Sequence, residues 1–442
     1  MARLFGTDGV RGKAGQGSLT NDFVRRLGWA TGLVLAEKEP KKPKAVFLVR
    51  DTRSSGPKLT QALSEGLGAS GYRVLDGGVL PTPAVAALLP KLPVAAGAVI
   101  SASHNPAVYN GVKLFGPGGL KLDESWEDAI ERHVLSEEET PASREQRVPL
   151  PKAFNLYLDF LVKTWPKNLS LKGFPIVVDC AHGAAHQTAP ELFRRLGANV
   201  TVINASPNGK NINHRCGALH PEGLIRAVKR HHAKLGVALD GDADRAMLVD
   251  EAGHVRDGDA VLLATARRWQ SRGELKAGTV VVTVMTNLGL FRAFEALGIK
   301  TKTTNVGDKY VWQGMKETGA VLGGEPSGHI IFRDHLPTGD GLLTALQVLA
   351  VLAESQQPFS ALTSLSVVYP QILLNVPVQE RVPLDKIPGF SKRLQEINTA
   401  LGTTGRTLIR YSGTEPLLRI MVEGPDRKTI ESHAQSLAGL VK

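Results

Sequence analysis

The sequence predicts an α/β protein with three repeated α/β domains, whose sheets are mixed and largely parallel, and a smaller α+β domain at the C-terminus. The first observation is that apolar runs typical of buried strands alternate with helical patterns along the chain. The second is that one order of elements (strand, helix, glycine, strand, helix, strand) recurs at a spacing of roughly 100–130 residues. This recurrence predicts three copies of one domain plan.

The elements of the repeat can be aligned from the sequence. Gly71, Gly197 and Gly298 each close a helical stretch, as expected for a residue that caps the C-terminus of a helix. The first strands are AVFLVRD (45–51), FPIVVDC (174–180) and TVVVTVMTN (279–287). The second helices are PTPAVAALLP (81–90), HPEGLIRAVKRHH (220–232) and GDKYVWQGMKETG (307–319), and the third strands are AAGAVIS (95–101), KLGVALD (234–240) and AVLGGE (320–325).

Polar and proline-flanked segments predict where the domains meet. The segment 137–152 and the residues near 251–253 mark the first two boundaries. The proline-bearing segment 367–390 is expected to be a linker into the last domain. There, residues 406–424 predict two strands around a loop, and a closing helix follows from about Asp426 to Leu440. The predicted domains are 1–150, 151–253, 254–366 and 367–442.

The composition limits the class of protein. Of the 442 residues, 42% are hydrophobic and 21% are charged, which is the balance of a globular chain with a large core. We expect a cytoplasmic protein without a membrane partner, because no apolar run could span a bilayer and no signal-peptide pattern opens the chain. Two cysteines are too few for a disulfide framework or a zinc cluster. The net charge of +11 comes from scattered residues, which favours a small anionic substrate over a nucleic acid.

The third strand of each repeat is where chemistry is expected. In open α/β sheets, ligands bind beyond the carboxyl ends of the strands. The three strands end in ISASHNP (100–106), LDGDADR (239–245) and GEPSGH (324–329). Three different polar turns at one equivalent position predict a shared cleft in which each turn has its own chemical task.

Three aspartates spaced by two residues, Asp240, Asp242 and Asp244, bring three carboxylates toward one point. Like charges held together are costly without a cation, and oxygen ligands suit Mg²⁺ better than Zn²⁺. An EF-hand calcium loop has the same spacing, but it needs glycine where Arg245 stands and helices where this sequence has strand-like flanks. An acidic surface turn is the simplest alternative. Arg245 is placed to orient a carboxylate or to neutralise phosphate charge.

Ser103 follows the equivalent strand of the first repeat. A serine acts as a nucleophile when its proton is removed and the incoming charge is neutralised. Both glycines of the hydrolase elbow Gly-x-Ser-x-Gly are missing, so phosphoryl chemistry beside a metal is favoured over acyl transfer. Taken alone, the segment would be an ordinary turn. Lys113, in a glycine-rich stretch further on, is either a cation for the same cleft or an exposed loop lysine.

The turn of the third repeat offers Glu325, Ser327 and His329. Carboxylate and hydroxyl groups bind sugar hydroxyls directionally, and a histidine can pass a proton near neutral pH. A purely structural histidine is the alternative reading.

The last domain carries RYSGTEPLLR (410–419). Two guanidinium groups, two hydroxyls and a glycine that frees backbone N–H groups make a phosphate clamp. The segment is not a Walker loop, because no G-x-x-x-x-G-K-[ST] occurs in the chain. The candidate phosphate-binding residues are Arg410, Ser412, Gly413, Thr414 and Arg419.

Taken in order, ISASHNP, DGDADR, GEPSGH and RYSGTEPLLR resemble the four signature motifs of the α-D-phosphohexomutases, and the resemblance covers the whole chain. It implies four domains around a central cleft. It also implies that Ser103 is a phosphoserine whose phosphate shares one Mg²⁺ with the three aspartates, and that Arg245 lies next to this metal. The other implied roles are sugar binding by Glu325 and Ser327, binding of the phosphate that is not transferred by Arg410, Ser412, Gly413, Thr414 and Arg419, and charge stabilisation or acid–base work by Arg11, Lys113 and His329.

Three further segments are similar to the branch of this family that acts on glucosamine phosphates: FGTDGVRG (5–12), YNGVKLFGPGGLKL (109–122) and VGDKYV (306–311). Lys309 and Pro326 depart from the Arg and Gln that this branch more often has. The resemblance implies interconversion of glucosamine 6-phosphate and glucosamine 1-phosphate through a hexosamine 1,6-bisphosphate, which also serves as activator. The product would supply amino sugar for cell-wall UDP-N-acetylglucosamine.

Other activities stay open at this point. A phosphomannomutase or phosphoglucomutase of the same family is one alternative, and a metal-dependent seryl-phosphate phosphatase is another. The expected partner is a phosphorylated hexosamine, with no nucleic acid and no membrane. The sequence leaves the oligomeric state open, with a homodimer as one candidate.

Overall fold

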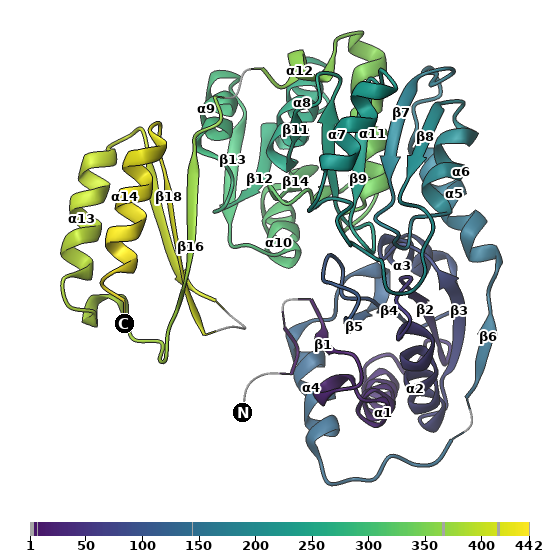
Figure 1. Cartoon of the computed structure of the whole chain (residues 1–442). Helices are drawn as coiled ribbons and strands as arrows, with labels where there is room; N and C mark the ends of the chain where they lie inside the picture. The colour runs from purple at the N-terminus through teal and green to yellow at the C-terminus, as the bar shows by residue number, and fades with distance from the viewer. Residues whose placement is uncertain (1–3, 7, 144, 365–366, 413–415, 442) are drawn as a thin grey trace. The chain divides into compact units, whose positions relative to one another are not determined.

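The computed structural model describes residues 4–6, 8–143, 145–364, 367–412 and 416–441. The chain divides into two compact units (Figure 1). The first unit consists of residues 1–283 and 298–364, and the second consists of residues 284–297 and 365–442. The sheets of the first unit are mixed and that of the second is antiparallel, so the predicted α/β fold with a smaller C-terminal α+β part is confirmed.

The sheets of the first unit repeat one strand order. In each, a central strand pairs in parallel with a neighbour on either side, and an antiparallel strand extends one edge. The central strands are β2 (Ala45–Arg50), β7 (Pro175–Asp179) and β12 (Thr279–Thr283). Their parallel neighbours are β3 (Arg73–Val79), β8 (Asn199–Ile203) and β13 (Lys300–Thr304) on one side and β4 (Ala96–Ile100), β9 (Leu235–Leu239) and β14 (Leu322–Gly324) on the other. The antiparallel strands are β5 (Tyr109–Phe115), β10 (Ala246–Asp250) and β15 (Ile330–Phe332).

Additional strands extend two of these sheets. The first has the order β1-β5-β4-β2-β3-β6, in which β1 (Val10–Lys13) and β6 (Arg147–Pro149) form the edges. The second has the order β11-β10-β9-β7-β8, with β11 (Val255–Arg256) at one edge. The third has the order β13-β12-β14-β15. The order 5-4-2-3 of the first sheet thus returns as 10-9-7-8 and 15-14-12-13, which confirms the predicted repeat.

Helices connect the strands at the predicted places. The first helices of the repeats are α2 (Gly56–Ala69), α6 (Thr188–Arg195) and α9 (Leu288–Ala296), and the second are α3 (Pro83–Leu88), α7 (Glu222–Arg230) and α10 (Asp308–Thr318). Gly71, Gly197 and Gly298 follow the first helices with φ of +82°, +82° and +67°, the left-handed conformation that favours glycine, so the predicted helix caps are confirmed. Of these helices, α9 belongs to the second unit, although it follows a strand of the first. The long helices of the first unit outside the repeated pattern are α1 (Asn21–Lys38), α4 (Glu124–Leu135), α5 (Lys152–Thr164), α8 (Gly258–Ser271) and α11 (Gly341–Ser355).

The second unit corrects one prediction. The segment 367–390 is not a linker throughout, because its residues Gln371–Pro377 form β16, which pairs along its whole length with β18 (Leu417–Glu423). The sheet order is β16-β18-β17, with β17 (Arg406–Tyr411) on the other side of β18. Since β16 is an edge strand, it can end in a proline, and this concealed it in the sequence. Two helices, α13 (Phe390–Leu401) and α14 (Arg427–Ala438), pack with this sheet.

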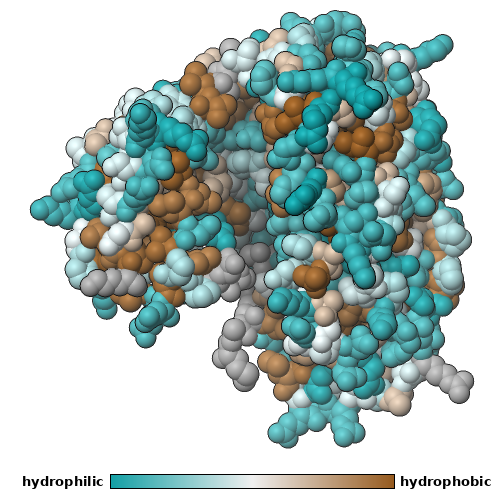
Figure 2. Space-filling view, viewed as in Figure 1, coloured by the Kyte–Doolittle hydropathy of each residue, from teal (hydrophilic) through white to brown (hydrophobic). Residues whose placement is uncertain are grey.

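The surface carries scattered apolar side chains. On the face drawn in Figure 2, apolar side chains are interspersed with hydrophilic ones. Within the described ranges, no helix combines the length and the apolar character needed to cross a membrane.

A buried hydrogen bond joins α5 to the start of α11. The Tyr157 hydroxyl donates to Asp340 Oδ2 at 2.8 Å, and both side chains are buried. Asp340 Oδ1 accepts from the backbone N–H groups of Leu342 and Leu343, so Asp340 is the N-cap of α11. Burial raises the pKa of Asp340 to about 6, although these donors favour its ionised form. The next residue, Gly341, donates its N–H to the Ala243 carbonyl at 2.9 Å. This bond connects the cap to the turn that carries Asp240, Asp242 and Asp244, the predicted metal turn.

We predict that Tyr157→Phe lowers the free energy of unfolding by about 1–3 kcal/mol, because Asp340 Oδ2 loses its buried donor. Since the pKa of Asp340 is raised in the folded state, folding favours its protonated form, and the resulting stability is lost as the pH rises from about 4 toward about 6. Above that range the ionised carboxylate depends on its donors, so the loss in Tyr157→Phe should be larger at pH 8 than at pH 5. Urea unfolding at both pH values measures this difference, and a loss independent of pH would contradict it.

Candidate active site

The three turns predicted to share a cleft meet within the first unit. The Ser103 hydroxyl donates to Asp240 Oδ2 at 2.6 Å, which joins the first turn to the second. His329 Nδ1 lies 3.8 Å from Asp244 Oδ2, which joins the third turn to the second. Each turn follows a third strand, β4, β9 or β14. The strand ends therefore bring together residues that lie more than 80 positions apart in the sequence.

The serine turn holds Ser103 in an unusual backbone conformation. Ser103 has φ of +52°, a left-handed value that is costly for a residue with a Cβ, and its side chain is buried. Its N–H donates to Ser101 Oγ at 2.9 Å, and the Ser101 hydroxyl donates to Asp51 Oδ2 at 2.7 Å. The strained serine thus rests on a buried polar network that begins at the end of β2.

Arg53 holds the serine turn through hydrogen bonds to its backbone, and the sequence prediction missed this residue. Its buried guanidinium donates to the carbonyls of Ser103 at 3.0 Å and Asn105 at 2.8 Å, and it pairs with Asp51 at 2.8 Å. A planar guanidinium can satisfy several carbonyls and a carboxylate at once, which an ammonium cannot do in the same geometry. The available signal was an Asp-x-Arg pattern directly after β2, at the same sheet edge as the other turns.

Asn213, also missed, holds the serine turn from the second repeat. Its side-chain amide donates to the carbonyls of Ser103 at 2.9 Å and Asn105 at 3.1 Å. Asn213 itself has φ of +59°, a conformation that asparagine tolerates better than most residues. The Ser103 carbonyl therefore accepts from two different segments, and the bond from Asn213 joins the serine turn to the second repeat.

The aspartate turn fits a hard cation. One carboxylate oxygen from each of Asp240, Asp242 and Asp244 lies within 4.8 Å of the others, and all three side chains are buried. Among the described residues, Asp242 Oδ1 and Asp244 Oδ1 are buried without a hydrogen-bond partner. Burial, and then the charges of Asp244 and Asp242, raise the pKa of Asp240 well above its ordinary range. Orphaned oxygens and mutual repulsion are what a divalent cation would relieve.

Cationic side chains border the aspartates. Lys113 is buried, with Nζ 2.8 Å from Asp242 Oδ2, 3.6 Å from Asp244 Oδ2 and 3.0 Å from Asp8 Oδ2. Burial alone lowers the pKa of Lys113, but these carboxylates outweigh it and raise the pKa above its usual value. Arg11 pairs with Asp8 in turn. Lys113 is therefore a buried cation of the site and not an exposed loop lysine.

Arg245 follows the aspartate turn. Its N–H donates to Asp240 Oδ1 at 3.3 Å, and its Nε lies 3.7 Å from Asp244 Oδ1. The pKa of its guanidinium is raised, since the attraction of Asp244 and Asp240 exceeds the opposing effect of burial. Arg245 therefore stays charged beside the carboxylates.

The third turn presents Glu325 and Ser327 together. The Ser327 hydroxyl donates to Glu325 Oε2 at 3.2 Å, and Glu325 Oε1 accepts the Gly307 N–H at 2.8 Å. His329 Nε2 accepts the N–H of Gly339 at 2.9 Å. A backbone N–H can only donate, so the His329 ring carries its proton on Nδ1, the nitrogen that faces Asp244.

The predicted phosphate clamp lies in the second unit. Arg410 and Arg419 are directly opposite each other in the register of β17 and β18, so their side chains leave the sheet on the same face. Like charges in such a pair repel, and an anion between them would relieve the repulsion. Ser412 is buried and its N–H donates to the Leu417 carbonyl at 2.8 Å. The other two predicted members, Gly413 and Thr414, lie outside the described residues.

Family models match the chain over nearly its whole length. They are the phosphoglucomutase/phosphomannomutase alpha/beta/alpha domains I, II and III, which match residues 2–141, 155–253 and 257–368, and the C-terminal domain of the same family, which matches residues 373–440. The chain therefore belongs to the phosphoglucomutase/phosphomannomutase family.

Relatives that match nearly the whole chain are named phosphoglucosamine mutases. The chain is 46% identical to a phosphoglucosamine mutase of Sorangium cellulosum, over 100% of this chain and 93% of the relative. It is also 46% identical to a phosphoglucosamine mutase of Syntrophomonas wolfei, over 98% of this chain and 97% of the relative. A solved phosphoglucomutase/phosphomannomutase family protein of Burkholderia thailandensis superposes with a TM-score of 0.79 at 26% identity, covering 100% of this chain and 97% of that one.

A more distant structure shares the fold. It is the N-acetylphosphoglucosamine mutase of Aspergillus fumigatus in complex with GlcNAc-6P and magnesium. Its TM-score is 0.70 at 19% identity, over 100% of this chain and 95% of that one.

We predict that Asp244→Asn weakens the binding of Mn²⁺ by more than roughly tenfold, since even outer-shell substitutions at metal sites cost that much. Asp244 Oδ1 is one of the buried oxygens without a hydrogen-bond partner in the described part of the chain, so a cation is its natural partner. Titration calorimetry with Mn²⁺ measures the effect. Asp334→Asn, at an exposed aspartate that pairs with Lys276, is the matched control and should bind like the wild type. Equal affinities of both variants would contradict the metal assignment.

Proposed function

We propose that the protein interconverts glucosamine 6-phosphate and glucosamine 1-phosphate, with Ser103 as the covalent carrier of the phosphoryl group. The observation that carries this proposal is the 2.6 Å contact between the Ser103 hydroxyl and Asp240, within a triad of buried carboxylates. Relatives that are 43–46% identical over nearly the whole chain are named phosphoglucosamine mutases, which supports the amino sugar as substrate.

In the proposed reaction, phosphorylated Ser103 gives its phosphoryl group to the free hydroxyl of the bound sugar phosphate. The bond between phosphorus and the serine oxygen breaks, a bond to the sugar oxygen forms, and the proton of the sugar hydroxyl passes to a base, while the serine oxygen regains a proton. The resulting hexosamine 1,6-bisphosphate turns end for end in the site. The reverse transfer of its other phosphoryl group restores phosphoserine and releases the isomeric product. Free bisphosphate would act as activator by phosphorylating Ser103.

One Mg²⁺ per site would be held by Asp240, Asp242 and Asp244 together with the Ser103 side chain. When bound, it would neutralise charge on the phosphoryl oxygens. Lys113 and Arg245 add positive charge beside the aspartates, and Arg11 reaches the same network through Asp8. These residues stabilise the transferred group without having to move.

Two orientations of one sugar require contacts that both orientations share. Glu325 and Ser327 present a carboxylate and a hydroxyl on one turn, and we assign them to the sugar hydroxyls. The phosphate that is not transferred goes to Arg410, Ser412, Gly413, Thr414 and Arg419 in the second unit. In either orientation of the sugar, one end would then face the phosphoryl donor Ser103, and the phosphate at the other end would bind these residues of the second unit.

Three residues are candidates for the acid–base steps. Lys113 and Arg11 carry protons near the aspartates, and His329 carries its proton on Nδ1. A donor at His329 would therefore have to act from the nitrogen that faces Asp244. The geometry favours charge stabilisation by Lys113 and Arg11.

The surroundings of the reaction are proposed as well. We assign the protein to the cytoplasm, where its two buried free thiols, Cys180 and Cys216, fit a reducing compartment.

The phosphorylated hexosamine is its partner, the product serves the synthesis of cell-wall UDP-N-acetylglucosamine, and neither nucleic acid nor membrane takes part. A homodimer is the proposed assembly to test by light scattering. The proposed domains keep the limits 1–150, 151–253, 254–366 and 367–442, with the serine, metal, sugar and phosphate turns in that order.

We predict turnover of glucosamine 1-phosphate in preference to mannose 1-phosphate and glucose 1-phosphate. Coupled assays of product formation with each sugar phosphate measure the preference as kcat/KM. A preference for a neutral sugar would favour a phosphomannomutase or phosphoglucomutase. Release of inorganic phosphate without the isomeric sugar phosphate would favour the phosphatase alternative.

We predict that Ser103→Ala abolishes mutase turnover, because no other hydroxyl lies within hydrogen-bond distance of Asp240 among the described residues. Intact mass and peptide mapping of the wild type should find one phosphate on Ser103. Ser101→Ala removes the acceptor of the Ser103 N–H, but Arg53 and Asn213 still hold the Ser103 carbonyl, so this variant should keep both the phosphate and measurable activity. Full activity of Ser103→Ala would overturn the covalent mechanism.

A further inference from the structure

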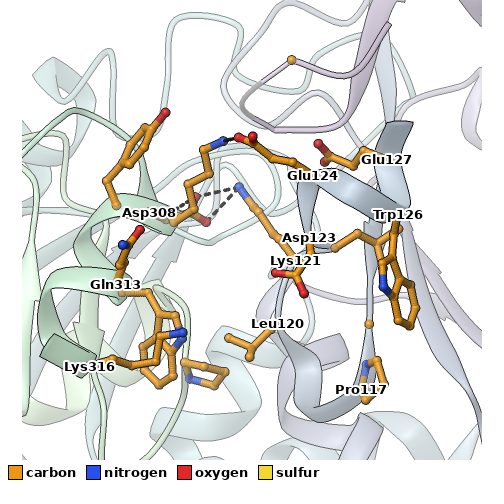
Figure 3. A pocket seen from close by; sticks show the side chains of 17 residues that line it. Pro117, Leu120, Lys121, Asp123, Glu124, Trp126, Glu127, Asp308, Gln313 and Lys316 are labelled. Carbon is orange, nitrogen blue, oxygen red and sulfur yellow. Dashed lines mark hydrogen bonds and ion pairs between the residues drawn. The ribbon is translucent and has the colours of Figure 1, made fainter. Parts of the chain in front are cut away.

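Two ion pairs join the first repeat to the third beside the candidate active site. A cavity of about 510 Å³ lies between the segment 116–127 and α10, and Figure 3 shows its lining. Lys121 Nζ lies 2.8 Å from Asp308 Oδ2, and Lys309 Nζ lies 2.6 Å from Glu124 Oε1. In Figure 3 the Lys121 and Asp308 side chains point toward one another from opposite sides. The segment 116–127 contributes Lys121 and Glu124, and α10 contributes Asp308 and Lys309. Each side therefore supplies the cation of one pair and the anion of the other.

The two ion pairs differ in how much of their side chains is exposed to solvent. Lys121 and Asp308 have side chains that are 23% and 13% exposed, whereas those of Lys309 and Glu124 are 32% and 61% exposed. Exposed pairs contribute little to stability, because water screens them. Lys121 also approaches Asp8 Oδ1 at 2.6 Å, so one ammonium serves two carboxylates. The Lys121 pair is therefore the one with structural consequences.

Asp8 connects Lys121 to the metal turn. Asp8 Oδ2 lies 3.0 Å from Lys113 Nζ, and Lys113 contacts Asp242 Oδ2 at 2.8 Å. An unbroken series of alternating charges thus runs from Lys121 to the aspartates.

Asp308 connects Lys121 to the turn that carries Glu325 and Ser327, the proposed sugar turn. It opens α10 directly after Gly307, whose N–H donates to Glu325 Oε1 at 2.8 Å. Gly307 has φ of +131°, a conformation open to glycine, so the backbone here is shaped to make this contact. Asp308 also suits the positive end of the α10 dipole. A shift of Asp308 would move the group that orients the Glu325 carboxylate.

We propose that Lys121 is a positioning residue that sets the place of the sugar-binding carboxylate Glu325 relative to Ser103 and the metal turn. Its ammonium holds Asp308 on one side and Asp8 on the other, and without it the two carboxylates repel each other. Burial by itself lowers the pKa of Lys121, but Asp308 and Asp8 outweigh it, so the cation is retained. The inference rests on the proposed function, since it concerns how the same sugar is held.

Lys121→Met tests the proposal, because methionine keeps most of the length of lysine and removes its charge. We expect KM for glucosamine 1-phosphate to rise roughly 10- to 100-fold, the cost of a small misplacement of a binding group. The Mg²⁺ concentration for half-maximal activity should change less than about twofold. Lys309→Met, the same substitution at the exposed pair on the same boundary, is the control and should stay near the wild type. Lys121→Arg, which restores the charge, should recover part of the loss.

A double-mutant cycle separates positioning from direct contact with substrate. If Lys121 acts through Asp308, the effects of Lys121→Met and Asp308→Asn on KM should not add, because both break the same pair. Additive effects, or a KM within about twofold of the wild type in Lys121→Met, would overturn the proposal. A loss that falls on Mg²⁺ activation instead of KM would also overturn it, by placing the effect at the metal turn.

Hydrogen exchange keeps the inference testable if the proposed function fails. A wild type without mutase turnover would reject the function but not the positioning role. Faster exchange of residues 306–311 in Lys121→Met than in Lys309→Met would support positioning in that case as well. Equal exchange in the two variants would reject it. If Lys121→Met does not fold, Asp308→Asn breaks the same pair and takes its place in both measurements.

Discussion

The repulsion among three buried carboxylates is the constraint on which the rest of the site depends. Asp240, Asp242 and Asp244 are held together at the end of one strand, where burial makes their charges costly. The fold offsets this with cations from the first repeat, above all Lys113, and leaves carboxylate oxygens that a divalent ion would satisfy. A serine hydroxyl placed against such a cluster is suited to carrying phosphate, because the same cations neutralise the charge that a phosphate brings.

Much of this could be predicted from the sequence, because parallel strands that repeat must end at one edge of their sheets. The apolar runs before Ser103, Asp240 and Glu325 identified those ends, and the polar residues after each run identified the three turns. The glycine caps at 71, 197 and 298 were predicted for the same reason, since a left-handed residue leaves a clear signal in the sequence. The roles of the turns in catalysis, by contrast, remain predictions for the experiments above.

Residues that act across the chain could not be predicted in this way. Asn213 and Lys121 are ordinary polar residues in their local sequence, and the only local signal of Arg53 is the Asp-x-Arg pattern after β2. The importance of all three comes from partners 50 to more than 180 positions away. Strand β16 was missed for a different reason, because prolines at its ends resemble those of a linker. Local patterns describe which face or end of an element is polar, but only the folded chain determines which carbonyl or carboxylate a side chain finds there.

The membership of α9 in the second unit has a consequence for how these proteins can be divided. By sequence, α9 is the first helix of the third repeat, yet the Asn287 side chain binds both the N–H and the carbonyl of Tyr369, and Leu288 N–H donates to Glu423 at 2.8 Å. A fragment cut at the start of the C-terminal domain would leave these partners behind. Recombination between relatives that joined one protein's last domain to another's first three would therefore have to match α9 to its new neighbours. This ties the inheritance of the proposed phosphate clamp to that of a helix that ends more than 110 residues before Arg410.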